Sequence, residues 1–428
     1  MGAVTPRRWD VGRALVLVAG LGVVASACGQ ARLAAPPAPQ FISGERAAPT
    51  VVTVAPAPDA ELVQPEDVEP DMVPTAGSAE SDAPIDLGRM VVVDDAGIAV
   101  ANQAGWQQFD ASMTAALGGN QAFSVAVMVN GEIIHEFAAG ERVVGGDEVS
   151  TDDRFRIASI SKTVTAIVTM QLVEDGVLAL DDPIGDVVTG FLGIARPDPD
   201  AAAITVRELL SHTAGFPKYE SVFFGAGATT CADAAVRALS SGVSSGGSYN
   251  YSNMSYCVLG LLIEAVTGKP YERVADEHLL RPLGIDGMRM TSTYEVGPDE
   301  VAHAIGPNRN YMETLGAAGA WNATPADLTE IVNSLDHTTP GWKAVSAETA
   351  RSMRFRVDSG QQPSGYGLGL INYENDSWGH TGTIQNIHAM VLHQADGITW
   401  AVTVAGGSPS STGQLRHIVR NSLRRAFG

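Results

Sequence analysis

Basic residues are scarce in this 428-residue sequence, and the resulting excess of acid excludes one large class of partner. Its 27 lysines and arginines are set against 48 aspartates and glutamates, which gives a formal net charge of −21 at pH 7. Nucleic-acid binding requires a basic surface, so we expect no nucleic-acid partner. The sequence also lacks an H-E-x-x-H motif, so a zinc peptidase is not supported, and we expect no metal or cofactor. Apolar residues make up 45% of the chain, which is enough to bury a core.

The N-terminal apolar run, residues 14–25, is too short to span a bilayer comfortably. It follows three arginines and leads to small residues and Cys28, as in an export signal. Two interpretations stay open: Cys28 is lipidated as the first residue of the mature protein, or signal peptidase cleaves at an ordinary Ala25-x-Ala27 site. A cysteine directly after the small residues favours lipidation, although Ala25 stands where a lipobox usually has leucine. We therefore expect a signal peptide at residues 1–27 and an exported protein, lipid-anchored to the outer face of the cell membrane or otherwise secreted.

Residues 28–104 have the composition of a disordered linker. They include ten prolines between Pro36 and Pro84, many alanines and scattered acidic residues. Such a segment buries too little apolar surface to offset the entropy lost on ordering it. We expect an extended acidic spacer between the anchor and a folded domain at residues 105–428.

The pattern of the folded part predicts an α/β (α+β) domain. Two pairs of β-favouring runs lie near its ends, residues 123–129 with 132–137 and residues 387–392 with 398–404. Asn130-Gly131, between the first two, is a strong hairpin signal. Helical patterns occupy residues 160–175, 253–266, 325–335 and 413–427. Strands at both ends with helices between them predict an antiparallel sheet closed by distant segments, with an inserted helical region.

Ser159-Ile160-Ser161-Lys162 forms an S-x-x-K motif. On a helix that opens at Ser159, Lys162 lies one turn further along the same face, so its amine reaches the serine hydroxyl. A lysine kept neutral by burial or by nearby positive charge can serve as the base for a serine nucleophile. The motif alone is weak, because chance supplies it in roughly one chain in four of this composition. An N-capping serine beside a solvated lysine is then the plainer interpretation.

Two further motifs carry groups suited to substrate chemistry. Tyr251-Ser252-Asn253 reads Y-x-N just before a predicted helix, and a phenol can relay a proton while an amide holds a carbonyl. Tyr373-Glu374-Asn375 matches the same pattern, but it lies too close to the next motif to form a separate wall of a pocket. That motif, His380-Thr381-Gly382, fits a substrate-carboxylate site. Each motif by itself is explained more simply, by a turn with a packed aromatic or by a strand-end histidine.

Taken in order, the S-x-x-K, Y-x-N and H-T-G motifs resemble those of the serine β-lactamase-like family. This family includes class C β-lactamases, serine D-Ala-D-Ala carboxypeptidases and related esterases. The resemblance runs from about residue 105 to the C-terminus and includes the blocks 155–162, 177–183, 204–215, 251–260, 281–284, 318–319 and 324–328. It implies a β-lactamase/transpeptidase-like fold, a sheet flanked by helices plus a mostly helical subdomain, with the site between them.

The resemblance also implies a role for each matching residue. Three residues would carry the chemistry: the acylated nucleophile Ser159, with Lys162 and Tyr251 sharing the general base and acid roles. Others would bind substrate: Asn253 the amide and His380 the carboxylate, together with Thr381 and Gly382. The backbone N–H groups of Ser159 and Thr383 would form the oxyanion hole.

One position departs from the β-lactamases of this type, which usually carry lysine where this chain has His380. A histidine is only partly charged at neutral pH, which weakens the case for β-lactam hydrolysis. We expect a serine hydrolase acting through an acyl-enzyme on D-Ala-D-Ala-type amides, with a small-molecule or peptidoglycan-derived substrate. An esterase or weak β-lactamase using the same site is an alternative, and a non-catalytic cell-envelope binding protein is an alternative of another class. The sequence leaves the oligomeric state open.

Two remaining features concern the loop that carries Tyr251. Cys231 and Cys257 flank it and form an even pair in a chain expected to fold outside the cytoplasm, so we predict a disulfide between them. Two buried free thiols are the alternative. His212 lies in a block that the family shares, and we interpret it as a structural residue, since a lone histidine near an apolar run is usually a satisfied core residue.

Overall fold

The computed structural model of the protein describes nine stretches of the chain: residues 85–93, 99–119, 121–143, 145–218, 220–224, 228–302, 310–354, 365–373 and 376–428. Cys28 lies outside them, and so do the predicted signal peptide, the lipid anchor and most of the predicted linker. Within these stretches, no helix combines the length and the apolar character needed to cross a membrane.

Secondary structure begins upstream of residue 105. A short helix, α1 (Leu87–Met90), leads into the antiparallel pair β1 (Val91–Val93) and β2 (Ala99–Ala101). Met90 is fully buried, and its carbonyl accepts a hydrogen bond from the indole N–H of Trp106 (3.2 Å). The end of the segment expected to be a linker, from residue 85, therefore packs against the domain through this buried side chain and this hydrogen bond. The division of the chain at residue 105 otherwise stays a prediction.

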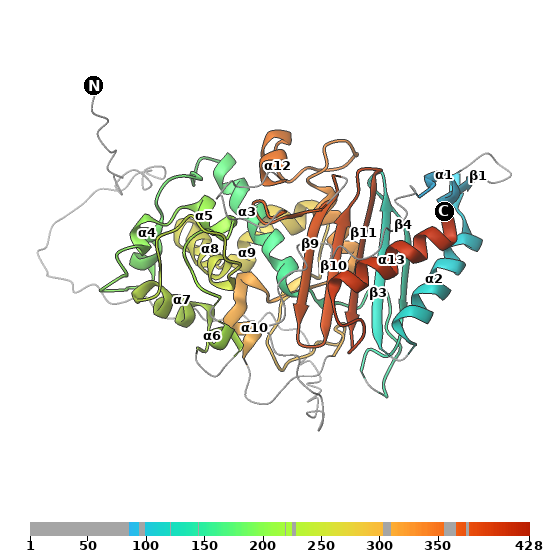
Figure 1. The fold of residues 1–428 in the computed structure, drawn as a ribbon, viewed down its shortest axis with the longest axis horizontal. Coiled ribbons are helices and arrows are strands. Elements are labelled where there is room, and N and C mark those ends of the chain that lie inside the picture. The colour runs from blue at the N-terminus through green and yellow to red at the C-terminus, as the bar shows by residue number, and fades with distance from the viewer. Residues whose placement is uncertain are drawn as a thin grey trace, which may run out of the picture. The chain divides into compact units, whose positions relative to one another are not determined.

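A six-stranded antiparallel sheet in the order β4-β3-β11-β10-β9-β8 forms the centre of the domain (Figure 1). Asn130 and Gly131, with φ of +50° and +85°, turn the chain between β3 and β4, and Gly397 lies in the turn between β10 and β11, so both predicted hairpins are confirmed. β11 pairs with β3, so strands from opposite ends of the domain lie side by side, as the sequence predicts. The strands are β3 (Ala122–Val129), β4 (Glu132–Ala139), β8 (Ile371–Asn372), β9 (Trp378–Ile384), β10 (Ile387–His393) and β11 (Ile398–Ala405).

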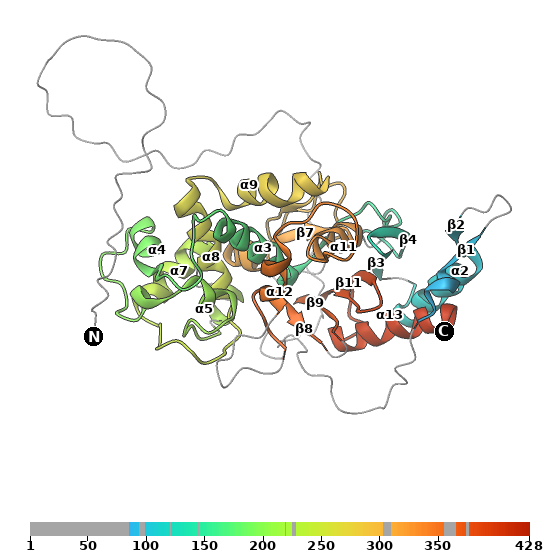
Figure 2. The ribbon, with the colours of Figure 1, turned by 90° about the horizontal axis from the view of Figure 1, so that it is seen from above.

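One face of the sheet is covered by the two terminal helices of the domain, α2 (Gln103–Leu117) and α13 (Thr412–Phe427), which pack against each other (Figure 2). Side chains alternate between the faces along β11. Trp400 and Val402 are buried on the α2–α13 side, whereas Ala401 belongs to the core on the opposite side. The predicted α+β arrangement of a sheet flanked by helices is confirmed.

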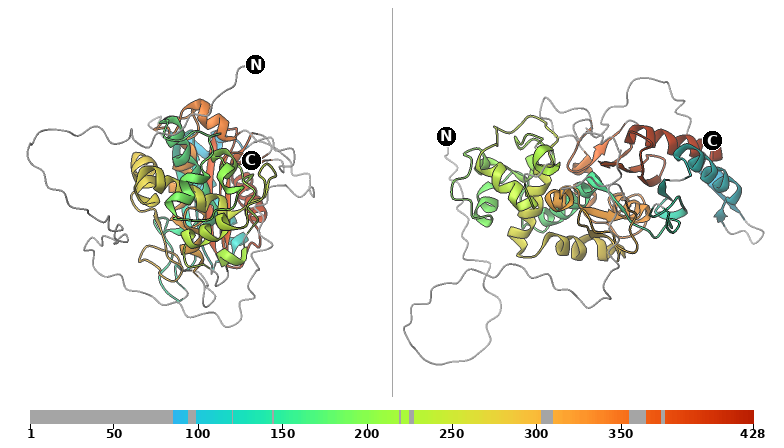
Figure 3. Two further views of the ribbon diagram at one scale, coloured as in Figure 1. Left: turned by 90° about the vertical axis from the view of Figure 1, so that its left-hand side faces the viewer. Right: turned by 90° about the horizontal axis from the view of Figure 1, so that it is seen from below.

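The opposite face is covered by α11 (Pro325–Asn333) (Figure 2). The inserted helical region lies at the end of the sheet formed by β9 and the short edge strand β8 (Figure 1, Figure 3). Among its helices, α3 is the most enclosed, with its residues from Ser161 to Leu172 all buried. The helices of this region are α3 (Ser161–Glu174), α4 (Gly185–Phe191), α5 (Val206–Leu210), α6 (Glu220–Phe224), α7 (Cys231–Ser240), α8 (Asn253–Thr267), α9 (Tyr271–Ala275), α10 (Tyr311–Leu315) and α12 (Ala347–Arg354).

Local signals explain where the helices that matter most begin and end. α8 is capped by Ser252, whose hydroxyl accepts from the N–H of Met254, and it ends at Gly268 in the left-handed conformation (φ +67°). α11 begins with Thr324 as N-cap and Pro325 at its first position, as the sequence predicts. Gly176, with φ of +69°, follows α3. These caps fix the ends of the elements that carry the site.

A small second sheet places the segment before α3. Its order is β5-β7-β6, with β5 (Phe155–Arg156), β7 (Trp321–Ala323) and β6 (Arg289–Met290). The N–H of Ile157 continues the β5–β7 pairing by donating to the carbonyl of Trp321 (3.1 Å). This sheet thereby holds together two segments that are far apart in the sequence: the one that leads into α3 and the one that follows residue 318.

The predicted disulfide between Cys231 and Cys257 is confirmed. It joins the first residue of α7 to α8, with the two Cα atoms 5.7 Å apart. Gly316 lies against the Cβ of Cys231, so the bond also borders the turn that precedes β7.

We predict that replacing both cysteines with serine, C231S/C257S, lowers the free energy of unfolding by about 3 kcal/mol, because the bond closes a loop of 26 residues in the unfolded chain. Urea unfolding of the variant and of the oxidised wild type measures the difference. Equal stability of the two proteins would contradict the prediction.

Candidate active site

Ser159 and Lys162 lie where a 3-10 turn continues into a helix. The turn η2 (Ala158–Ile160) runs directly into α3, which places Lys162 at the second position of α3 and one turn beyond Ser159. Lys162 Nζ is 2.9 Å from Ser159 Oγ, the contact expected from the S-x-x-K spacing. Lys162 is fully buried and Ser159 is partly exposed. The pair therefore combines an enclosed amine with a serine residue that is partly exposed.

Two further oxygens surround the amine of Lys162. Nζ donates to Asn253 Oδ1 at 2.7 Å and to the carbonyl of Ala318 at 2.8 Å. Burying an ammonium without such partners would be costly, and its three N–H donors match these three acceptors. Asn253 is the first residue of α8, and Ala318 ends the turn η6 (Gly316–Ala318). Three separate segments thus meet at one nitrogen atom.

Tyr251 forms an aromatic wall beside this amine. The centroid of its ring is 5.0 Å from Lys162 Nζ, within the range of a cation–π contact. Between Tyr251 and Asn253, the Ser252 hydroxyl donates to the carbonyl of Pro217 (2.7 Å). The Y-x-N motif therefore places Tyr251 and Asn253 on either side of a fixed helix cap, both next to Lys162.

The H-T-G motif lies on β9, and its glycine lets this strand approach the nucleophile segment closely. A Cβ at Gly382 would collide with the carbonyl of Ile157, just before η2. Ala158, beside Ser159, has φ of +46°, a left-handed backbone that is uncommon for a residue with a side chain. Strain of this kind persists only where the surroundings enforce it. The oxyanion hole expected from the N–H groups of Ser159 and Thr383 stays a prediction.

His380 stands where a substrate carboxylate was expected to bind, but protein encloses its ring completely. Nδ1 is 2.6 Å from the carbonyl oxygen of Thr381, and Nε2 is 3.2 Å from the hydroxyl of Tyr366. A carbonyl only accepts, so Nδ1 carries the proton and Nε2 accepts from the tyrosine. Burial, reinforced by the positive charge of Lys162, lowers the pKa of His380 to about 3. The histidine is therefore neutral at pH 7, and its role in carboxylate binding stays a prediction.

Two residues near the motifs take no part in the site. Ser161 is fully buried, and its Oγ accepts from the backbone N–H of Trp321 (3.3 Å), so Ser159 is the serine that the lysine contacts. Tyr373, from the second Y-x-N match, packs in the core beside α13, where the guanidinium of Arg416 lies 4.9 Å from its ring centroid. Across the described stretches, no three His, Cys, Asp or Glu side chains are grouped so that they could hold a metal ion.

Sequence reasoning missed three contributors to the site: the carbonyl of Ala318, Tyr256 and Tyr366. Tyr256 and Tyr366 are fully buried, and burial raises the pKa of both phenols. The Tyr256 hydroxyl donates to the carbonyl of Leu210 (2.8 Å). The sequence signal that could have indicated Tyr366 is the glycine-rich run of residues 365–370. Glycine allows this segment to approach the site closely, because a Cβ at Gly369 would collide with α3.

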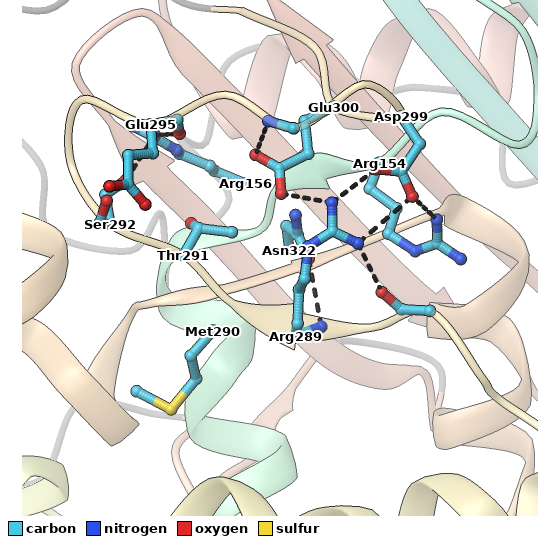
Figure 4. Close-up of polar contacts among 12 residues, drawn as sticks. Arg154, Arg156, Arg289, Met290, Thr291, Ser292, Glu295, Asp299, Glu300 and Asn322 are labelled. Atoms are coloured by element: carbon cyan, nitrogen blue, oxygen red, sulfur yellow. Dashed lines mark hydrogen bonds and ion pairs between the residues drawn. The ribbon is translucent and has the colours of Figure 1, made fainter. Parts of the chain in front are cut away.

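Arginines tie the strand before Ser159 to the segment that follows β6 (Figure 4). Arg156, in β5, is 3% exposed and donates to the carbonyl of Ser292 (2.7 Å). Arg154 and Arg289 both pair with the carboxylate of Asp299, at 2.6 Å each. These contacts fix β5, and with it the start of η2.

The buried histidines predict how stability depends on pH. His380 and His212 are both neutral in the folded protein because burial lowers their pKa values below the usual 6.5, whereas both bind protons in the unfolded chain below that pH. Stability is therefore fully present above about pH 6.5 and falls as the pH drops towards 3. Each histidine contributes a slope of about 1.4 kcal/mol per pH unit.

Urea unfolding between pH 7.5 and 4.5 measures this slope. The variant H380N, which removes one buried histidine, should show a shallower fall than the wild type, whereas H417N, at an exposed position of α13, should match it. A slope unchanged in H380N would contradict the assignment of a neutral His380.

Comparison with known proteins identifies a family whose sequence model matches this chain. A sequence model described as Beta-lactamase matches residues 107–423. The chain is 31% identical over 274 residues to penicillin-binding protein 4 of Amycolatopsis lactamdurans, which covers 62% of this chain and 66% of that protein. It is 27% identical over 332 residues to esterase EstB of Burkholderia gladioli, which covers 66% and 83%. The chain spans 44% to 66% of the length of four curated relatives that it matches.

Solved structures share the fold. The D-amino acid amidase from Ochrobactrum anthropi, in complex with L-phenylalanine amide, superposes with a TM-score of 0.60 at 22% identity, covering 76% of this chain and 99% of that one. The octameric penicillin-binding protein homologue from Pyrococcus abyssi gives a TM-score of 0.58 at 24% identity, covering 70% and 73%. At these identities the likeness establishes the fold alone.

Proposed function

The chain belongs to the beta-lactamase family, and on this basis we propose that it is a serine hydrolase that forms an acyl-enzyme on Ser159. The observation that carries the proposal is the contact between Lys162 Nζ and Ser159 Oγ at 2.9 Å. A buried amine at hydrogen-bond distance from the hydroxyl of a partly exposed serine is the arrangement that nucleophilic catalysis requires. A serine that merely caps a helix would not need the amine to be enclosed.

The chemistry follows from the positions of three side chains. Lys162, after it has released one of its three amine protons, accepts the hydroxyl proton of Ser159 as Oγ attacks the substrate carbonyl carbon. Tyr251, whose ring lies against the amine, gives its phenol proton to the departing amine or alcohol as the bond to the carbonyl carbon breaks, and takes up the proton that Lys162 accepted. Water then attacks the carbonyl carbon of the acyl-enzyme; its hydroxyl stays on that carbon, one of its protons passes to Ser159 Oγ as the acyl bond breaks, and the acid product leaves. The N–H groups of Ser159 and Thr383 would stabilise the oxyanion in both steps.

We place the substrate among D-Ala-D-Ala-type amides, in a carboxypeptidase-like reaction. Support comes from relatives named penicillin-binding protein 4 and D-alanyl-D-alanine-carboxypeptidase/endopeptidase AmpH, the latter from Escherichia coli. Asn253 would hold the substrate amide, and the His380–Gly382 segment of β9 would face the substrate's far end. We also propose that the protein is exported and anchored at Cys28, with a linker leading to the domain that begins at residue 105. A peptidoglycan-derived substrate fits this location.

Ester hydrolysis is the second candidate, and the state of His380 favours it. This neutral histidine uses its one N–H within the protein, so it offers no charge to a substrate carboxylate. Esters need no such charge, and one matched relative is named an esterase. A weak β-lactamase would share the same site, and a binding protein without turnover is the alternative of another class.

Covalent labelling tests the proposal. We expect a fluorophosphonate and, separately, a labelled penicillin to add one adduct that peptide mass spectrometry locates on Ser159. The variant S159A should lose the adduct, and S161A, which removes the neighbouring buried hydroxyl, should keep it. Absence of any adduct with both probes would favour the binding protein and contradict the hydrolase.

A small substrate panel then separates the candidates within the hydrolase class. Release of D-alanine from a D-Ala-D-Ala peptide supports the carboxypeptidase-like reaction. Hydrolysis of a short-chain nitrophenyl ester without peptide cleavage supports the esterase.

A further inference from the structure

His212 is a buried residue held in an unusual backbone conformation next to the site. Its side chain is 1% exposed, and its φ is +58°, in the left-handed region. Such a backbone is uncommon outside glycine, and asparagine, aspartate and histidine adopt it more often than other residues. The residue follows α5, in a segment that contacts the loop carrying Tyr251.

The side chain and the backbone of His212 both hold the loop that carries the Y-x-N motif. Nδ1 accepts a hydrogen bond from the backbone N–H of Ser252 (3.2 Å), the residue between Tyr251 and Asn253. Its carbonyl accepts from the N–H of Asn250 (2.8 Å). The imidazole also lies against the ring of Tyr251, with centroids 4.3 Å apart. One residue therefore fixes both the backbone and the ring of the motif.

These contacts require a neutral imidazole. Nδ1 can accept from Ser252 only when it carries no proton, so the single proton is on Nε2. Nε2 has no hydrogen-bond partner in the described part of the chain. Burial and the charge of Lys162 lower the pKa of His212. The groups that face it are Lys162 from α3, His380 from β9, Tyr256 from α8, and Tyr249, Tyr251 and Tyr366 from loops.

We propose that His212 is a positioning residue for the reaction, which keeps the phenol of Tyr251 aligned with Lys162 and Ser159. The proposal rests on the proposed function. It assigns the left-handed backbone and the Nδ1 contact to one purpose, the alignment of a proton-transfer group. This alignment matters more to the chemical step than to substrate binding. Packing of a core histidine alone would not call for an acceptor aimed at the backbone of the motif.

Three variants separate the contacts. H212N keeps an acceptor near the position of Nδ1 and suits a left-handed backbone. H212A removes the acceptor and the ring, and H212Q moves the polar group away from Ser252. H393N is the control, because His393 is also buried but contacts Asp336, Thr399 and Trp378 instead of the site.

The test measures the rate constant for fluorophosphonate labelling of Ser159, kcat and KM for a nitrophenyl ester, and the thermal midpoint. We expect H212A and H212Q to lower the labelling rate constant and kcat about 10- to 100-fold with KM changed less than about threefold, as for a misplaced catalytic group. The labelling rate constant and kcat of H212N should be at least about tenfold higher than those of H212A and H212Q. H393N should keep the wild-type rates. If H212A does not fold, the contrast between H212N and H212Q carries the test.

Two outcomes would overturn the proposal. One is a labelling rate constant in H212A and H212Q within about threefold of the wild type. The other is a reduced fraction of labelled protein in which the remaining molecules react at the wild-type rate, which would indicate a role in folding only. If the wild type itself does not label, the proposed function has failed; if the wild type labels and the variants label equally fast, only the role of His212 has.

Discussion

The burial of one amine, Lys162 Nζ, is the constraint on which the rest of this structure depends. A lysine enclosed by protein needs acceptors for its N–H groups, and here they are Ser159 Oγ, Asn253 Oδ1 and the carbonyl of Ala318. Each comes from a different part of the chain. The fold can therefore satisfy the lysine only by bringing η2, the start of α8 and η6 together, and this convergence creates the candidate active site.

Several features far from the amine serve this convergence. The small β5-β7-β6 sheet holds the segment before Ser159 beside the one after Ala318, and Arg156 anchors β5 to the carbonyl of Ser292. The disulfide connects α7 to α8, whose first residue is Asn253. The backbone positions that build the site are thus each held by several contacts. Such contacts keep catalytic groups within the narrow range of geometry that a reaction tolerates.

Much of the fold could be predicted because its signals are local. Asn130-Gly131, the Thr324-Pro325 cap and Gly268 each act on neighbouring residues, and the elements they bound were predicted within a few residues. The S-x-x-K contact could also be predicted, since it spans one helical turn. The environment of His380 could not, because its neutrality depends on Tyr366 and on Lys162, which meet it only through tertiary packing. For the same reason the Ala318 carbonyl was not expected, because a backbone acceptor cannot be recognised from the type of its side chain.

If Lys162 activates Ser159, the rate of covalent labelling of Ser159 depends on the amine of Lys162. In the variant K162M the side chain keeps the reach of the lysine stem as far as Cε but loses the amine, so a protein that remains folded should still present the Ser159 hydroxyl. We expect the rate constant for fluorophosphonate labelling of Ser159 to fall by between about 10²- and 10⁴-fold, the contribution of a positioned general base. Labelling of folded K162M at the wild-type rate would contradict this expectation.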